Sequence, residues 1–474
     1  MTRGEDDVLV LGGGLTGLSA ADALTRAGLQ VTVVERDGAA GGLARTVAHG
    51  PFRFDLGGHR FLTRDPRIQA LVLELVGAEC QSVERRSQIH LRGRVIDYPL
   101  NPANALSGLG TLTALRIVGD RLRAGLMGRL RPRPLVSLED WVVRHFGRTL
   151  FDLYFREYSE KVWGLPCDRI SMDWVARRIQ GLSLGAAVAN AFWRRAGRGI
   201  PTLADRFLYP AHGIGRIAER LQERIEQRGQ GRVLVDHQVL GIAHHGARVQ
   251  AVRVRRGARA FTLEARSFVS TIPINALVRM LDPRPPLEVL RAAAGLRFRD
   301  LVLVAVMLDR PRATDQSWLY FPDRTVSFGR IHEPTNWSQQ MAPPGKTLLV
   351  AEHFCFRGGD TWMASDQELA ERTVADLVKR GIVFPGEVEG TTVLRIPQAY
   401  PLFEVGYPER LRTVMGYLGR LENLFPAGRG GAFTYCNMDD ALAAGLGAAA
   451  KVLDSKAWET GAEEPAALPE RRFA

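Results

Sequence analysis

Cysteine is scarce in this sequence, and its spacing suits neither a metal site nor a disulfide framework. The chain of 474 residues has four cysteines, which lie far apart without a CxxC pair or the His/Cys spacing of a zinc site. We therefore expect no metal, reduced thiols and a cytoplasmic location. The cysteines are Cys80, Cys167, Cys355 and Cys436.

Long hydrophobic runs are also missing. No apolar stretch reaches the roughly 20 residues that a membrane-spanning helix needs. A core strand is expected as early as Val8, which leaves no room for a signal peptide. One basic, amphipathic stretch, residues 115–134, leaves peripheral membrane contact open. A solvent-facing helix on a soluble domain is the favoured interpretation of that stretch.

Basic residues outnumber acidic ones, with 63 Lys and Arg against 51 Asp and Glu and a formal charge of +12. The sequence has no zinc-finger, homeodomain or RRM pattern, so nucleic acid is not an expected partner. A phosphate-bearing small molecule explains the excess more economically, and a solvated basic surface is an equally good explanation. The hydrophobic content of 46% is that of a globular chain, long enough for two or three packed subdomains.

The beginning of the chain has the pattern of a dinucleotide clamp. Residues 8–11 predict a buried strand, and Gly12, Gly14 and Gly17 follow as G-x-G-x-x-G. These glycines allow the tight turn, the close approach of a pyrophosphate and the packing of the next helix. A second strand ends at Glu35, whose carboxylate is suited to a ribose diol. The flanking strands, helix and acid make the pattern specific.

The next segment, "RDGAAGGLARTV", selects the dinucleotide. It resembles the FAD-binding start of the amine oxidase, protoporphyrinogen oxidase and UDP-galactopyranose mutase superfamily, in which the acidic residue is followed by a glycine pair and an arginine. The resemblance implies FAD as the cofactor. It also implies that a further glycine loop, "LGGHRF" at residues 56–61, lies beside the flavin ring. It adds these cofactor-binding residues to the first glycines and Glu35: Arg36, Gly42, Leu43, Arg45, Gly57 and Gly58. His59 becomes a catalytic candidate.

A second cofactor signature lies near the end of the chain, in "AGRGGAFTYCNMDD". It resembles the mutase motif G-R-L-x-x-Y-x-Y-Y-D-M-D, with Phe433, Cys436 and Asn437 as departures. The resemblance places Gly428, Arg429, Asn437 and Met438 at the cofactor, Arg429 among the catalytic residues, and Phe433 and Tyr435 at the substrate. The strand-like segment around Val239 is expected near the adenine, as in this superfamily.

A third motif, "YSEKVWG", resembles the mutase segment Y-T-x-K-x-W-G. A tryptophan face can cover a base or sugar, and an arginine fork can grip a diphosphate. A helical hairpin with buried tryptophans is the alternative interpretation. The resemblance implies catalytic roles for Lys161 and Arg178, and substrate contacts for Tyr158, Trp163, Trp174 and Arg178.

The fold is expected to be α/β (α+β). It comprises a Rossmann-type FAD-binding domain with a parallel sheet, a helical insertion and an antiparallel-sheet substrate domain. The FAD-binding segments are residues 1–70, 206–275 and 416–456. A mainly helical substrate or cap domain takes residues 71–205, the antiparallel-sheet substrate domain takes 276–415, and a flexible tail takes 457–474.

Two reaction classes remain open. In a UDP-galactopyranose mutase-like enzyme, reduced flavin N5 attacks a nucleotide-linked or phosphorylated sugar, the phosphate-bearing group leaves, and the sugar ring re-closes in a different size. In an oxidoreductase of the amine oxidase or protoporphyrinogen oxidase type, oxidised flavin removes a hydride from a different substrate. Either reaction involves a small-molecule substrate and an external electron donor or acceptor. The sequence does not indicate the oligomeric state.

Overall fold

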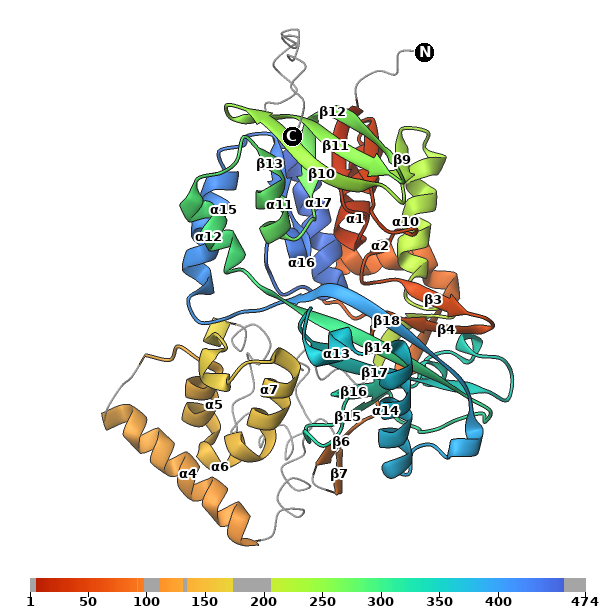
Figure 1. Cartoon of the computed structure of the whole chain (residues 1–474), viewed down its shortest axis with the longest axis vertical. Coiled ribbons are helices and arrows are strands. Elements are labelled where there is room, and N and C mark those ends of the chain that lie inside the picture. Colours follow the sequence, from red (N-terminus) through yellow and green to blue (C-terminus); the bar gives the residue numbers. More distant parts are fainter. Residues whose placement is uncertain (1–5, 92, 98–110, 131–133, 174–205, 456–474) are drawn as a thin grey trace.

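The computed structural model describes residues 6–91, 93–97, 111–130, 134–173 and 206–455 (Figure 1). Trp174, Arg178 and the expected tail at 457–474 lie outside these residues. Within them the chain forms a nucleotide-binding sheet with its helices, an antiparallel sheet beside it, and a group of helices at the lower left of Figure 1. This mixture confirms the expected α/β (α+β) class.

The first sheet has the strand order β13-β10-β11-β12-β1-β2-β9, with β19 paired to β12. Its parallel part joins β1 (Asp6–Leu11) to β2 (Val31–Val34) and to β12 (Arg259–Ser270). The outer parallel strands are β9 (Gly231–Leu234) and β19 (Leu424–Pro426). An antiparallel extension contains β10 (Gln238–His245) and β11 (Arg248–Arg256). Strand β13 (Leu281–Asp282) pairs in parallel with β10 at the edge. Three distant stretches of chain therefore build one sheet.

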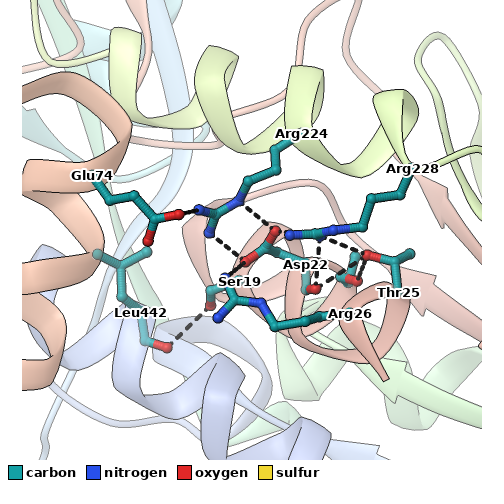
Figure 2. A network of polar contacts seen from close by, with 9 residues as sticks. Ser19, Asp22, Thr25, Arg26, Glu74, Arg224, Arg228 and Leu442 are labelled. Carbon is teal, nitrogen blue, oxygen red and sulfur yellow. Dashed lines mark hydrogen bonds and ion pairs between the residues drawn. The ribbon is translucent and has the colours of Figure 1, made fainter. Parts of the chain in front are cut away.

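The helices of this part are joined by an ionic network centred on a buried aspartate (Figure 2). Asp22 of α1 (Leu15–Arg26) is 2% exposed and accepts hydrogen bonds from Arg224 at 2.7 Å and Arg228 at 2.7 Å. Arg224 belongs to α10 (Arg216–Gln227) and also reaches Glu74 of α2 (Pro66–Val76) at 2.8 Å. Ser19 donates to the carbonyl of Leu442 in α17 (Met438–Asp454) at 3.0 Å. The network thus holds α1, α2, α10 and α17 together.

The second sheet is seven-stranded, in the order β18-β14-β17-β16-β15-β6-β7. Its centre is β14 (Phe298–Leu308), in which every residue is buried. The neighbours of β14 are β17 (Thr347–Cys355) and β18 (Val388–Pro401), both antiparallel to it. The strands β15 (Trp318–Tyr320) and β16 (Arg330–His332) follow toward the edge. Helix α14 (Asp366–Lys379) packs against β14 and β18.

The described part of the range 71–205 contains strands as well as helices. It supplies β5 (Cys80–Glu84), which pairs with β8 (Arg206–Pro210), and also β6 (Ser87–Leu91) and β7 (Arg94–Asp97). Because β6 pairs with β15, this stretch extends the antiparallel sheet. Its described helices are α4 (Thr111–Leu130), α5 (Leu138–Phe146), α6 (Arg148–Leu150) and α7 (Arg156–Trp163).

The remaining described helices and strands flank these parts. Strands β3 (Thr46–His49) and β4 (Phe52–Asp55) form a hairpin after the second glycine pair. Helices α11 (Ile274–Met280), α12 (Leu287–Ala294) and α15 (Tyr407–Leu418) lie on the left of the upper sheet in Figure 1. Short helices α13 (Asp360–Met363) and α16 (Gly428–Gly431) follow β17 and β19.

Candidate functional site

The first glycine loop has no space for side chains at two of its three motif positions. A Cβ on Gly17 would lie 2.0 Å from the carbonyl oxygen of Gly12, and one on Gly12 would lie 2.2 Å from Thr271 Oγ1. Gly12 also has a φ of +108°, which favours glycine. Gly14 differs, because the nearest atom to its Cβ position is Gly42 Cα at 3.8 Å. Of the three motif positions, Gly14 alone has room for a Cβ at ordinary van der Waals distance.

Gly14 is also the N-cap of α1, and no side chain caps that helix. The N-terminus of a helix presents backbone N–H groups and the positive end of its dipole, which together favour an anion. The loop therefore has both the room and the donors that a pyrophosphate requires.

Glu35 closes this loop from the end of β2. Its carboxylate is 7% exposed and accepts from the Gly13 N–H at 2.7 Å and the Asp37 N–H at 2.9 Å. Arg45 ties the second glycine pair to the same place, since it donates to the Gly42 carbonyl at 3.0 Å and pairs with Asp37 at 2.9 Å. Leu43 is half-buried and Arg36 is exposed. The structure thus brings together the residues expected from both glycine motifs.

The glycine loop at residues 57–59 touches the antiparallel sheet. The Gly58 N–H donates to Glu352 Oε1 of β17 at 3.1 Å, and a Cβ on Gly58 would lie 2.2 Å from Trp318 Nε1. The next residue, His59, has a buried Nδ1 that makes no hydrogen bond to any described residue. Burial, followed by the charge of Arg429, lowers the pKa of His59 to about 3. His59 is therefore neutral at ordinary pH and has one ring nitrogen available to a ligand.

Glu352 is the centre of the polar contacts beneath that loop. It is fully buried and pairs with Arg330 of β16, whose Nε lies 2.8 Å from Glu352 Oε1. Burial opposes the charge of Glu352, but Arg330 and His332 outweigh it, so the pKa of the carboxyl lies below its ordinary value. His332 stacks on Trp337 at 4.9 Å, and burial lowers its pKa. The pair thus remains charged, with neutral His332 beside it.

Arg429 enters the same region from the other end of the chain. Its guanidinium donates to the carbonyl of Ala399 at 3.2 Å and to that of Cys436, and it lies 5.3 Å from the centre of the Tyr400 ring. No carboxylate of the described residues forms an ion pair with it. Burial, followed by the charge of Glu352, raises the pKa of Tyr400, so its hydroxyl keeps its proton. Arg429 is thus a half-buried cation for which the described residues supply no ion-pair partner.

These residues form one group, called here the sheet-end cluster. Electrostatic coupling links His59 to Arg429, Glu352, Arg330 and His332, and links Tyr400 to Tyr435. With both imidazoles neutral, two guanidinium groups and one carboxylate leave a net charge of +1. The arrangement favours an anionic ligand. Its members are His59, Arg330, His332, Glu352, Tyr400, Arg429 and Tyr435.

Of the motif residues on α7, Tyr158 and Trp163 lie near this cluster, whereas Lys161 has other contacts. Tyr158 couples electrostatically to Arg330 and contacts Tyr320 edge-on at 5.9 Å. Trp163 is 4% exposed and packs edge-on against Tyr400 at 6.5 Å, so it supports that ring from within the core. Lys161 instead donates to the carbonyls of Phe321 and Asp323, each at 2.8 Å. Burial lowers the pKa of Lys161 to about 8.

The remaining expected site residues make mainly packing and helix-capping contacts within the protein. Phe433 is 1% exposed and packs edge-on against Phe298 at 5.2 Å and Phe403 at 5.7 Å. Val239 is 6% exposed in β10. Asn437 caps α17 through a capping box with Asp440, and Met438 is buried. Gly428 has a φ of +75°, and its Cβ position lies 2.5 Å from Thr16 Oγ1 of α1. Ligand roles for these residues stay predictions.

Sequence reasoning missed four members of the cluster. Arg330 and His332 lie on β16, Glu352 on β17 and Tyr400 on β18. The available signal was a charged or imidazole side chain inside an otherwise apolar strand, as in "TLLVAEHFC". Such groups are rarely buried without a partner or a function.

A comparison with known proteins identifies the family of the chain. Residues 15–453 match the family described as flavin containing amine oxidoreductase. The chain belongs to this family. Its cofactor is FAD, and the uncrowded position at Gly14 and the start of α1, which no side chain of the described residues caps, fit the pyrophosphate of that cofactor.

Curated relatives of this flavoenzyme include porphyrinogen oxidases. Coproporphyrinogen III oxidase from Bacillus subtilis (strain 168) is 23% identical over 451 residues, or 87% of this chain and 91% of the relative. Coproporphyrinogen III oxidase from Mycobacterium leprae (strain TN) is 26% identical over 399 residues, or 78% of this chain and 82% of the relative.

Among solved structures, the flavoenzyme is similar to a reduced UDP-galactopyranose mutase. The TM-score is 0.81 and the identity 23%, with 94% of this chain and 95% of that chain covered. A putative protoporphyrinogen oxidase from Exiguobacterium sp. 255-15 has a TM-score of 0.74 and 18% identity, with 96% and 100% covered. These likenesses establish the fold.

The flavoenzyme's described residues contain no cluster of metal-binding side chains. Among the same residues, no helix combines the length and apolar character needed to cross a bilayer.

Proposed function

We propose that this flavoenzyme acts on a nucleotide-linked or phosphorylated sugar, in a reaction like that of the UDP-galactopyranose mutases. The observation that carries the proposal is the sheet-end cluster with Arg429, a half-buried guanidinium without a carboxylate partner among the described residues. A cation in such surroundings is favourable chiefly when an anion comes to it. A phosphate group of the substrate is the proposed anion.

Each glycine loop has a part in placing FAD. The residues around Gly14 would hold the pyrophosphate, and Glu35 would accept from the ribose while it fixes the loop through Gly13. The Gly57–Gly58 loop would lie along the flavin ring. Bound there, FAD supplies the ring atom that attacks the sugar or accepts a hydride. The tight spacing between Gly58 and Trp318 keeps this loop close to the antiparallel sheet.

The protein side chains bind and orient the substrate. Arg429 offers a planar fork suited to two phosphate oxygens. The hydroxyls of Tyr158, Tyr400 and Tyr435 would donate to further oxygens of the substrate. Neutral His59 would direct its buried Nδ1 to a substrate hydroxyl, because no group in the described part of the chain forms a hydrogen bond with that atom. None of these groups needs to exchange a proton for the binding to occur.

A second candidate is removal of a hydride from a carboxylated substrate by oxidised flavin. The similarity to coproporphyrinogen III oxidases over most of the chain favours it. Arg429 would pair with a carboxylate as readily as with a phosphate. The two candidates share the site and differ in the flavin oxidation state that supports turnover.

Product analysis under anaerobic conditions tests the proposal. Purified holoenzyme is incubated with a panel of UDP-sugars and with coproporphyrinogen III, with the flavin either oxidised or reduced by dithionite. The proposal expects a ring-isomerised sugar only with reduced flavin, as detected by chromatography and NMR. Bleaching of oxidised flavin together with an oxidised tetrapyrrole would favour the second candidate. Turnover of neither class would refute both.

A further inference from the structure

Helix α4 carries a row of leucines on the outside of the protein. Their exposed fractions are 69% for Leu115, 70% for Leu122, 60% for Leu126 and 68% for Leu130. At about 100° per residue, these positions fall within an arc of about 80° on one side of the helix. These residues are called here the leucine stripe. A stripe of this kind is normally buried against another surface, so its exposure requires an explanation.

The opposite side of α4 is fastened to the protein. Ile117 is 5% exposed, and the carboxylate of Asp120 accepts from the backbone N–H of Thr149 at 2.9 Å and from its hydroxyl at 2.6 Å. A Cβ on Gly147 would lie 2.9 Å from Asp120 Cβ, so the turn before α6 packs directly on the helix. These contacts fix the rotation of α4 about its axis. The leucine stripe therefore faces outward. Helix α4 itself lies at the lower left edge of the molecule in Figure 1.

The charges along the stripe are positive. Arg116 and Arg123 are exposed, and helical spacing places both at one border of the leucines. Asp120, the acidic residue of this helix, is held by Thr149 on the inner side. The outer side of α4 thus combines apolar side chains with neighbouring guanidinium groups. This combination matches a bilayer surface, where acyl chains lie beneath anionic phosphates.

We propose that α4 docks this enzyme on the surface of an anionic phospholipid bilayer. The helix lies in the plane of the interface, with the leucine stripe among the upper acyl carbons and with Arg116 and Arg123 against lipid phosphates. The proposal is independent of the substrate, because it rests on a face of the protein outside the sheet-end cluster.

Vesicle flotation with the holoenzyme tests the docking. Vesicles of phosphatidylcholine alone are compared with vesicles that also contain phosphatidylglycerol, at low and high salt. The expected result is binding to the anionic vesicles that weakens with salt. The double variant Leu122→Glu/Leu126→Glu should bind at least about tenfold more weakly, because it places charge in the apolar layer. The double variant Arg116→Glu/Arg123→Glu should lose the preference for phosphatidylglycerol.

The matched control is Leu287→Glu, because Leu287 is 61% exposed on α12, away from this helix. It should float like the wild type, and the milder Leu122→Ser/Leu126→Ser checks the result if the glutamates lower the yield. Absence of wild-type flotation would overturn the proposal, as would unchanged flotation of both stripe variants. Light scattering that shows a dimer dissociated by the stripe variants would assign the stripe to a second copy and would also overturn it.

Discussion

The buried pair of Glu352 and Arg330 should be required for the stability of the sheet-end cluster. Glu352 has an exposed side-chain fraction of 0% and Arg330 one of 16%, so solvent screens this pair little. Replacing Glu352 by Gln keeps an oxygen that can accept from the Gly58 N–H, but it leaves the charge of Arg330 without compensation. Breaking a buried pair from one side costs about 3–5 kcal/mol. We expect Glu352→Gln to lower the free energy of unfolding by that amount.

The assay is urea unfolding followed by circular dichroism, with an exposed pair as the reference. Glu84 and Arg86 are 58% and 54% exposed, and Glu84→Gln should cost about 0–1 kcal/mol. The double variant Arg330→Met/Glu352→Leu should be more stable than the sum of its single variants predicts by at least about 2 kcal/mol. A cost for Glu352→Gln no larger than that for Glu84→Gln would refute the reasoning.

Three further predictions concern the glycine loop, a buried acid and a buried imidazole. Gly14→Ala should reduce the FAD content measured by flavin absorbance and leave the melting temperature of the FAD-free protein unchanged. Gly17→Ala should lower both the FAD content and the melting temperature, because Gly17, unlike Gly14, lacks room for a side chain in the protein itself. Burial raises the pKa of Asp55 from 3.8 to about 6, so its native state binds the extra proton and the unfolding free energy falls as pH rises from about 4 to 6. Asp55→Asn should therefore gain about 3 kcal/mol relative to wild type over this interval, as measured by urea unfolding at each pH. His59, with a pKa of about 3, should contribute no titration to kcat/KM between pH 5 and 8, and His59→Gln should leave the shape of that profile unchanged.

Each of these predictions has a contrary result. Normal FAD content in Gly14→Ala would show that the pyrophosphate does not bind at this loop. A pH-independent difference between Asp55→Asn and wild type would show that Asp55 is ionised throughout. A pKa near 6.5 in the wild-type profile that disappears in His59→Gln would show that His59 is solvated and exchanges a proton.

Local signals explain why the cofactor loops could be predicted. A glycine motif, its helix and the acid at Glu35 occupy a short stretch of chain, and each has a direct steric or electrostatic reason. The loop at 57–59 could be named for the same reason, since a glycine pair permits a close approach. Its contact with Glu352 could not be predicted, because the two meet only after the separate sheets have packed.

The rest of the cluster depends on strand register. Arg330 lies opposite Glu352 because β16 and β17 pair in that register, and no local pattern specifies it. Lys161 shows a second limit of motif matching, because a motif does not specify the contacts of its side chains. The ammonium of Lys161 donates to two carbonyls after β15, and its predicted role in the site stays a prediction. Likewise, β6 and β7 are short strands that pair with each other, and the pairing of β6 with β15 is a tertiary contact that no local pattern specifies.

The most direct test of the central claim is the affinity of the reduced holoenzyme for UDP compared with uridine. The two ligands share the base and ribose and differ only in the diphosphate, so their comparison isolates the anion. Anaerobic titration followed by flavin absorbance should show UDP binding at least about tenfold more tightly, equivalent to about 1.4 kcal/mol, and Arg429→Met should remove most of that difference. Equal affinities for UDP and uridine, or an unchanged difference in Arg429→Met, would contradict an anion-binding role for the sheet-end cluster.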